Sequence, residues 1–390
     1  MSVGIEKIGF YTAPYYIDMV DLAEARNQDP NKFLIGIGQK QQSVIPPSQD
    51  VVSMAANAAE TILTEEDKKT IDMIIFGTET GIDNSKAASM YLQSLLGISD
   101  YARAFEVKQA CYGGTAGIQM GINYLALNPD RKVLVIGADI ARYGLETPGE
   151  VTQGGGAVAM LLSSNPTVLA LDGKSAFYSK NIMDFWRPNY TKEARVDGHY
   201  SNDVYVDFFN RTFNQYLDRY NKQVTDFDAL VFHLPYPKMG VKALRTVVPQ
   251  EEENNPLWVE FNHSKLYNSL VGNLYTGSLY LSLISLIANS KTIPAGANIG
   301  LFSYGSGAQG EFYSGVLGEF DRKLLKQSVD QQINRRKRLT ITEYEQMYRS
   351  GLKETADLSI NYSDDDSRFV LKGRAKDKLI YLDQVTGEDK

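Results

Sequence analysis

The chain has 390 residues, of which 43% are apolar and 22% are charged. These proportions are typical of soluble globular proteins and exclude a disordered or fibrous chain, and the length suffices to bury a large core. The 47 acidic residues outnumber the 40 basic ones and give a net charge of -7, which is the wrong sign for a general nucleic-acid binder. We therefore expect no nucleic acid among the partners.

The sequence also lacks the marks of a membrane, secreted or metal-binding protein. Its longest apolar stretch, at residues 279–288, is interrupted by Ser282 and Ser285 and is too short to span a bilayer. A single cysteine, Cys111, excludes an intramolecular disulfide and a cysteine-based zinc site, and the three histidines are widely spaced. We expect a cytoplasmic protein with no membrane partner and no metal.

Strand-like and helix-like segments alternate along most of the chain. In its first part, apolar and β-branched runs predict strands at residues 70–77, 104–109 and 133–136. The stretches between them, 85–96 and 115–127, predict helices. Such alternation is typical of an α/β protein with buried sheets.

A weak internal repeat relates the two parts of the sequence. Two pairs of segments share an apolar strand, and in one pair this strand leads to a glycine-rich turn and a second strand. The paired segments are 133–161 with 299–312, and 73–76 with 229–232. Two copies of one α/β unit would explain the length without a linker. We place the boundary near Asn165, which predicts an N-terminal half at 1–165 and a C-terminal half at 166–390.

Cys111 is the first candidate for chemistry. It lies between a strand that ends near Ala110 and a helix that begins near Gly114. Unpaired amides and the helix dipole at such a position favour a thiolate over a thiol. A lone cysteine is more often an inert core residue, but the strand-Cys-Gly-Gly-helix pattern favours a nucleophile here.

Three further residues occupy positions from which a nucleophile can be assisted. His233 ends the strand 230–232 and precedes a proline-rich turn, a usual place for catalysis in α/β folds, with a structural histidine as the alternative. Glu79 follows the strand 70–77 and is a possible general base, although spacing alone favours a solvated turn residue. Asn273 could orient a substrate carbonyl or equally cap a helix.

Basic residues form two notable groups. Lys238 and Lys242 are four residues apart and therefore share one helical face. They could bind phosphate at the mouth of a tunnel, or they could be ordinary surface lysines. The run Arg335–Arg338 is the only dense basic run, and we interpret it as a solvated helix face.

Several segments resemble 3-hydroxy-3-methylglutaryl-CoA synthase of the bacterial type. They are Glu106–Gly114, Phe232–Tyr236, Gly272–Gly277, Val3–Tyr11, Ile35–Gln39, Asp184–Pro188 and Tyr304–Gly307. The resemblance runs over nearly the whole chain. It implies a thiolase-like α/β fold of two similar halves in αβαβα layers, usually as a homodimer. It also implies acetyl-CoA and acetoacetyl-CoA as substrates, with no other cofactor.

The same resemblance implies a role for each candidate. Cys111 would take the acetyl group from acetyl-CoA, Glu79 would remove a methyl proton from that group, and His233 would bind and polarise acetoacetyl-CoA. Hydrolysis of the Cys111 thioester would release 3-hydroxy-3-methylglutaryl-CoA, the precursor of mevalonate. Further residues would line the acyl pocket, support it, or meet the phosphates of CoA. These are Tyr143, Thr152, Phe185, Ser201, Asn273 and Ser306 for the pocket, Asp139 and Asp184 for support, and Lys238 and Lys242 for CoA.

The resemblance adds two expectations around the nucleophile. The backbone amides of Cys111 and Ser306 would stabilise the oxyanion of a tetrahedral intermediate. Ala110 would pack beside Cys111 and tune its rate.

Three alternatives remain at this point. A ketoacyl-carrier-protein synthase of the type that initiates fatty-acid synthesis also uses Cys, His and Asn, but it relies on decarboxylation and has no use for a base at Glu79. A hydrolase with a Cys-His-Asn triad is a candidate from another class, although the chain order does not suit it. An inactive thiolase-like scaffold is the third, and the presence of all three catalytic residue types argues against it.

Overall fold

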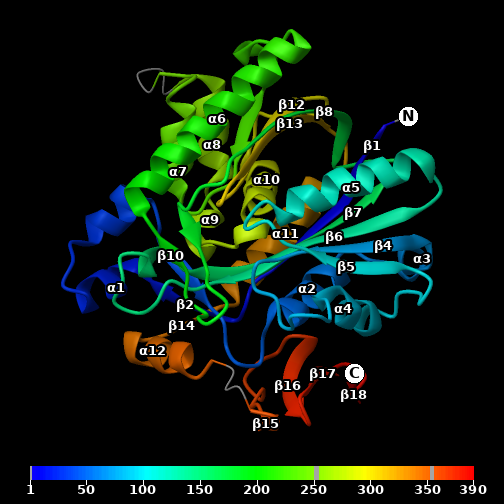
Figure 1. Cartoon of the computed structure of the whole chain (residues 1–390), viewed down its shortest axis with the longest axis vertical. Helices are drawn as coiled ribbons and strands as arrows, with labels where there is room; N and C mark the ends of the chain where they lie inside the picture. The colour runs from blue at the N-terminus through cyan, green and yellow to red at the C-terminus, as the bar shows by residue number, and fades with distance from the viewer. Residues whose placement is uncertain (1, 250–253, 352–354) are drawn as a thin grey trace.

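The computed structural model describes residues 2–249, 254–351 and 355–390, and its centre is a large mixed β-sheet (Figure 1). The strands of this sheet are β1 (Val3–Tyr11), β4 (Ile71–Gly77), β5 (Arg103–Val107), β6 (Lys132–Ala141), β7 (Gly154–Ser163), β8 (Leu169–Ser179), β11 (Ala229–Phe232), β12 (Asn298–Gly305) and β13 (Gln309–Leu317). Their order across the sheet is β11-β12-β13-β8-β1-β7-β6-β4-β5. The predicted strands 70–77, 104–109 and 133–136 are thus confirmed as β4, β5 and β6.

Two sets of strands within this sheet follow the same plan. In the first set, β1 and β7 pair antiparallel, as do β7 and β6, whereas β6 and β4 pair parallel. In the second set, the pairs β8–β13 and β13–β12 are antiparallel and the pair β12–β11 is parallel. The repeat expected from the sequence is therefore present, with β4 and β11 in equivalent places.

The two sets join where β1 pairs with β8, with Gly4 opposite Ala170. The predicted boundary near Asn165 falls between β7 and β8 and stays a prediction. The glycines at 154–156 lie inside β7, so the turn expected there is wrong. Glycine is needed because a Cβ on Gly154 would lie 2.6 Å from the carbonyl oxygen of Val271.

Helices cover both sets of strands in layers. They are α2 (Val51–Glu60), α4 (Ala88–Leu96), α5 (Gly113–Leu127), α6 (Gly198–Tyr220), α7 (Pro237–Leu244), α8 (Pro256–Ser264) and α10 (Ser278–Asn289). Side chains alternate along a strand, so β4 directs Met73 and Ile75 into a core with α5 and α10. The same strand directs Ile74 and Phe76 into a core with α2 and α4.

The second set of strands repeats this arrangement. Its inner residues, such as Val231, join the core of α5 and α10, and its outer residues, such as Phe232, pack against α6, α7 and α8. From one side to the other, the layers are helix, strand, helix, strand and helix. This is the αβαβα layering that the sequence resemblance implies.

The last part of the chain lies against the first half. A small sheet with the order β15 (Leu358–Ser359), β16 (Phe369–Ala375), β17 (Lys378–Asp383) and β18 (Glu388–Asp389) packs under α2 and α4 (Figure 1). Its Phe369 and Leu371 are buried in the same core as α2. Its Tyr381 donates a hydrogen bond of 2.6 Å to Asp50, which caps that helix. In space, this segment therefore belongs with residues 1–165.

The basic run 335–338 is not the solvated helix face that the sequence predicts. Helix α11 (Arg322–Asn334) ends before it, and β14 (Lys337–Arg338) pairs with β2 (Tyr15–Asp18). Arg336 is only 6% exposed. Its guanidinium donates to the Leu270 carbonyl at 2.9 Å, to Ser43 Oγ at 3.1 Å and to Gln41 Oε1 at 2.8 Å. Arg336 can be buried because these three oxygen atoms accept hydrogen bonds from its guanidinium.

Replacing Arg336 by alanine is expected to lower the free energy of unfolding by about 3 kcal/mol, because buried acceptors lose their donor and a cavity remains. Arg338 is the matched control, since it is more exposed and pairs with Asp21 at 2.6 Å. Arg338→Ala should cost about 1 kcal/mol or less. Urea unfolding of both variants measures the difference, and equal losses would contradict a buried structural role for Arg336.

None of the described helices is long and apolar enough to cross a membrane. The apolar stretch 279–288 forms most of α10, which is buried in the central layer.

Candidate active site

The main candidate residues come from equivalent ends of the two strand sets. Glu79 follows β4 and His233 follows β11, while Cys111 lies in the turn between β5 and α5. Helix α5 begins at Gly113, two residues beyond the cysteine. The carboxyl ends of strands at such positions are the usual place for binding and catalysis in α/β folds.

Cys111 is buried in a cluster with Ala141, Phe185, Ala194 and Tyr275. It is 9% exposed, and its Sγ lies 3.2 Å from Glu79 Oε1, to which it donates a hydrogen bond. Gly305 at the end of β12 allows the second set of strands to approach the turn that carries Cys111, because a Cβ there would lie 2.4 Å from the carbonyl oxygen of Gln109. Ala110 precedes the cysteine with a left-handed φ of 44°. Its influence on rate stays a prediction.

The thiol of Cys111 is not held as the thiolate that the sequence predicts. Burial raises the pKa of Cys111 well above its ordinary value, and so do the nearby carboxylates of Glu79 and Asp139. The position beside a helix N-terminus does not offset these effects, because burial penalises the charged form. In the free enzyme the thiol keeps its proton and needs a base to remove it.

Glu79 is positioned to be that base. Its side chain is 8% exposed, so the alternative of a solvated turn residue is wrong. Its backbone N–H donates to Asp139 Oδ1 at 2.8 Å. Burial and the charge of Asp139 raise the pKa of Glu79 to about 8 against a lowering effect of Arg187. A carboxylate tuned in this way suits general base catalysis near neutral pH.

Asp139 organises the loop that carries Glu79. It is fully buried at the end of β6, and its Oδ1 accepts from the Thr78 hydroxyl at 2.9 Å and the Thr80 hydroxyl at 2.8 Å. Its Oδ2 accepts from the Thr276 amide at 3.0 Å and hydroxyl at 2.6 Å. The aspartate therefore ties the Glu79 loop to the segment that follows Asn273, which fits the supporting role expected for it.

Asp184 supports the site from the second half. It is fully buried and accepts from the Tyr304 hydroxyl at 2.7 Å and from the Gly307 amide at 2.9 Å. The Ser201 hydroxyl lies 3.5 Å from its Oδ2. The structure thus brings Asp184 and Ser201 together and fixes the backbone directly after Ser306.

Aromatic rings form a wall beside Cys111. Tyr143, Phe185 and Tyr275 pack edge to face with ring centroids 5.7 to 6.2 Å apart, in one cluster with the cysteine. Asn273 Nδ2 donates to the Tyr143 hydroxyl at 3.3 Å, while its Oδ1 accepts from the Tyr275 amide at 2.8 Å. Asn273 therefore fixes the turn before α10 and belongs to this wall, and its orientation of a substrate carbonyl stays a prediction.

Two expected pocket residues, Thr152 and Ser306, form hydrogen bonds with residues other than Cys111. Thr152 lies in the short turn Glu150–Thr152, and its hydroxyl donates to the Gly149 carbonyl at 2.9 Å. Ser306 accepts at its carbonyl from Gln109 Nε2 at 3.3 Å. The oxyanion donors expected at the Ser306 and Cys111 amides stay predictions.

His233 is buried at the end of β11 and is 2% exposed. Its backbone N–H donates to the Phe302 carbonyl at 2.8 Å, and its carbonyl accepts from the Tyr205 hydroxyl at 2.6 Å. Its Nδ1 has no hydrogen-bond partner among the residues that the structure describes. Burial lowers the pKa of His233 to about 3, so the ring is neutral.

The two predicted phosphate-binding lysines lie on α7, within a larger basic cluster. Lys242 Nζ lies 3.4 Å from the Tyr236 hydroxyl. Burial lowers the pKa of Lys242, and the charge of Lys238 contributes to the lowering. The pKa of Lys265 is lowered in the same way, by burial and by the charges of Lys238 and Lys40. Lys40 and Lys265 come from distant segments of the chain, so the sequence did not predict that they lie near Lys238 and Lys242.

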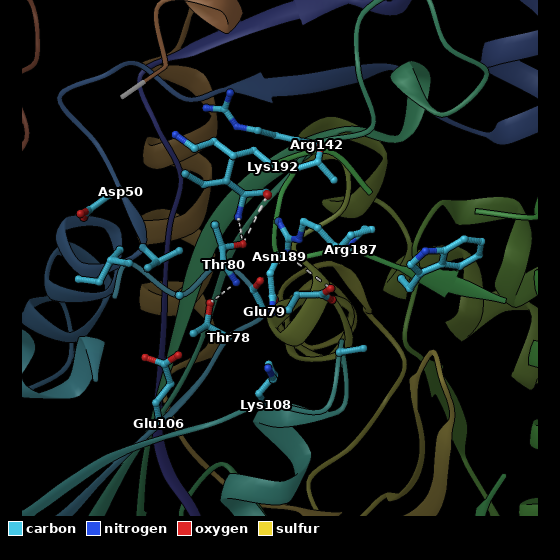
Figure 2. Close-up of a pocket in the computed structure, with 18 of the residues that line it drawn as sticks. Asp50, Thr78, Glu79, Thr80, Glu106, Lys108, Arg142, Arg187, Asn189 and Lys192 are labelled. Atoms are coloured by element: carbon cyan, nitrogen blue, oxygen red, sulfur yellow. Dashed lines mark hydrogen bonds and ion pairs between the residues drawn. The ribbon is translucent and has the colours of Figure 1, made fainter. Parts of the chain in front are cut away.

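A cavity of about 790 Å³ opens beside Glu79. Figure 2 shows Glu79, Arg187 and Arg142 among the residues that line it, and Phe185, Ser306 and Ala110 belong to its wall as well. Among residues 2–249, 254–351 and 355–390, no group of three or more His, Cys, Asp or Glu side chains could hold a metal ion. That no metal takes part remains an expectation.

Comparison with known proteins gives a consistent picture. The family model for the N-terminal part of hydroxymethylglutaryl-coenzyme A synthase matches residues 1–167, and the model for the C-terminal part matches 169–257 and 260–386. A hydroxymethylglutaryl-CoA synthase from Enterococcus faecalis is 51% identical over 369 residues, which cover 94% of this chain and 95% of that protein.

Two more distant relatives share the full length. The 3-hydroxy-3-methylglutaryl-ACP synthase PksG of polyketide biosynthesis in Bacillus subtilis is 31% identical over 413 residues, which cover 99% of this chain and 97% of that protein. A crystal structure of an HMG-CoA synthase complexed with CoA superposes with a TM-score of 0.92 at 41% identity, covering 98% of this chain and 99% of the other. The chain belongs to the hydroxymethylglutaryl-CoA synthase family and has its thiolase-like fold.

Proposed function

We propose that the chain condenses acetyl-CoA with acetoacetyl-CoA and water, through an acetyl-Cys111 intermediate, to give 3-hydroxy-3-methylglutaryl-CoA and CoA, a step toward mevalonate. The observation that carries the proposal is the buried hydrogen bond of 3.2 Å between Cys111 Sγ and Glu79 Oε1. A base this close to the sulfur reaches both the thiol proton and the methyl group of an acyl chain on that sulfur. Membership of the family supports the same reaction.

The first step transfers the acetyl group. Glu79 accepts the thiol proton as Cys111 Sγ attacks the carbonyl carbon of acetyl-CoA. The tetrahedral intermediate collapses with loss of the CoA thiolate, which takes the proton from Glu79 and leaves as CoA, so that Glu79 is again a carboxylate. The products are acetyl-Cys111 and free CoA, and the aromatic wall of Tyr143, Phe185 and Tyr275 encloses the acetyl group.

The second step forms the carbon–carbon bond. Glu79 removes a proton from the acetyl methyl group, which the thioester makes acidic, and the resulting enolate attacks the ketone carbon of acetoacetyl-CoA. Neutral His233 donates a hydrogen bond to the ketone oxygen, which becomes the tertiary alcohol when it takes the proton that Glu79 removed from the methyl group. Water then hydrolyses the Cys111 thioester and releases 3-hydroxy-3-methylglutaryl-CoA.

The basic cluster supports CoA as the carrier of the substrates. Lys40, Lys238, Lys242 and Lys265 lie close enough together for their charges to interact, and phosphates are natural partners for such a cluster. PksG is named for an ACP-linked product, so the carrier has to be tested directly.

The test follows acetoacetyl-CoA consumption by the purified chain, with the product identified by mass spectrometry. Acetyl-CoA, an acetylated carrier protein and no donor form the three arms. Consumption that needs acetyl-CoA and yields 3-hydroxy-3-methylglutaryl-CoA is the expected result. Activity with the carrier protein alone, or conversion of acetoacetyl-CoA to acetyl-CoA alone, would contradict the proposal. A condensing activity toward malonyl-carrier protein would favour the ketoacyl synthase alternative.

Replacing His233 by alanine is expected to lower kcat/KM for acetoacetyl-CoA by about 100-fold, because the ketone oxygen loses its hydrogen-bond donor. Formation of acetyl-Cys111 should continue, since that step does not use the histidine. Steady-state kinetics and intact-mass detection of the acetyl-enzyme separate the two effects. His263→Ala is the control, because His263 lies on α8 and contacts Glu260 at 3.1 Å. Similar losses in both variants would argue against this role.

We also propose that the protein works as a homodimer in the cytoplasm. The resemblance to the family supports the dimer, and the single cysteine fits a reducing compartment. Sedimentation equilibrium and cell fractionation test the two statements.

A further inference from the structure

Arg187 is the cation that meets Glu79. Its Nη2 donates a short hydrogen bond to the backbone carbonyl of Glu79 and lies 3.6 Å from Glu79 Oε2. The residue follows β9 (Phe185–Trp186) in the second half of the chain. Figure 2 shows both side chains at the cavity, with the arginine directed toward the glutamate. One arginine thus contacts both the main chain and the side chain of the proposed base.

These contacts complete the fixation of Glu79. Its amide is held by Asp139, its carbonyl by Arg187, Oε1 by Cys111, and Oε2 faces Arg187. The arginine itself has little freedom, because its side chain is 13% exposed and its guanidinium lies 5.8 Å from the ring centroid of Tyr275. A carboxylate held in this way points one oxygen at the nucleophile and the other at the cation.

We propose that Arg187 is a positioning residue that directs the Glu79 carboxylate toward Cys111 and sets the pH range in which Glu79 acts as a base. This inference rests on the base role proposed above for Glu79. It concerns a residue of the motif Asp184–Pro188 for which that mechanism assigns no task.

The charges around Glu79 determine how the loss of Arg187 would change the pKa of Glu79. The groups that face it are Cys111 from the turn before α5, Asp139 from β6, Arg187 from the segment after β9, and the hydroxyls of Tyr143 and Tyr275. Burial and Asp139 disfavour the charged carboxylate, whereas Arg187 stabilises it. Without the arginine, the pKa of Glu79 rises further, and less of the base form is present at neutral pH.

The test compares pH profiles of kcat for condensation in three variants. At pH 7, kcat of Arg187→Met should be about 10-fold to 100-fold lower than that of the wild type. The acid limb of its profile, where kcat falls with falling pH, should lie about one pH unit or more higher, so that much of the activity returns at alkaline pH. In Arg187→Lys the acid limb should move less, since lysine keeps the positive charge but its ammonium group cannot contact both the carbonyl and the carboxylate of Glu79. Arg211→Met is the control, because Arg211 lies on α6, outside the cavity, and pairs with Asp207 at 2.7 Å; its acid limb should stay at the wild-type position.

The outcomes distinguish a failure of the role proposed for Arg187 from a failure of the base role proposed for Glu79. If Glu79→Gln leaves condensation and its acid limb intact, the base role itself is wrong. Suppose instead that Glu79→Gln abolishes condensation. If Arg187→Met then has its acid limb at the wild-type pH, or is folded but inactive at every pH, only the role proposed for Arg187 is wrong. A structural defect would not recover at alkaline pH. If Arg187→Met does not fold, an unmoved limb in Arg187→Lys overturns the inference.

Discussion

Cys111→Ala is expected to lower the rate of condensation by about 10⁴-fold or more, because the variant lacks the thiol that carries the acetyl group. Incubation with acetyl-CoA alone should add one acetyl group to the wild-type chain and none to the variant, as measured by intact mass. Peptide mapping should place the group on Cys111. The change removes one buried sulfur atom, so the thermal unfolding temperature should stay close to that of the wild type.

Cys111→Ser is the stricter control for this result. Serine keeps a hydroxyl near Glu79 but is a far weaker nucleophile than a thiolate, so its residual rate should be close to that of the alanine variant. Acetylation of the alanine variant, or condensation within tenfold of wild type, would show that the nucleophile lies elsewhere.

Glu79→Gln is expected to reduce condensation by about 10³-fold, because the amide cannot accept the methyl proton. The wild-type rate should rise with pH and reach half of its plateau near pH 8, since the pKa of Glu79 is raised to about 8 and only its ionised form is a base. The variant should lose this dependence. Rate profiles from pH 6 to 9 measure both effects.

The same variant tests the coupling between the two groups. The charge of Glu79 raises the pKa of Cys111, so its removal should allow the thiol to ionise at lower pH. The rate of alkylation by iodoacetamide should therefore begin to rise at lower pH in Glu79→Gln than in the wild type. The conservative variant Glu79→Asp keeps the charge and should leave this onset nearly unchanged. An unchanged onset in Glu79→Gln would mean that the 3.2 Å contact does not govern the thiol.

The repeat and the layering could be predicted because they depend on local pattern. Runs such as Met73–Phe76 and Ala229–Phe232 are apolar throughout, as strands covered on both faces must be, and both became equivalent strands of the sheet. The glycines of β7 misled the prediction because glycine usually marks a turn. Here Gly154 is needed for close approach to the segment before Asn273, and Gly155 and Gly156 for close approach to Ile45 and to the Tyr11 carbonyl.

The state of the site could not be predicted in the same way. The low pKa expected for Cys111 came from its place before a helix, whereas burial and the carboxylates around it come from other segments. Arg336 was misjudged for the same reason, since its acceptors lie on residues 41, 43 and 270. Arg187 was visible as part of a motif, but its contact with Glu79 spans more than a hundred positions of the chain.

The small sheet near the C-terminus has a consequence for synthesis on the ribosome. Phe369, Leu371 and Tyr381 cover the outer helices of the half that is made first. Domains commonly fold as they emerge, with the N-terminal part first. Here α2 can pack against the strands of the first half early, but its outer side stays uncovered until Phe369, Leu371 and Tyr381 have been made, so the core is completed by residues translated hundreds of positions after its other members.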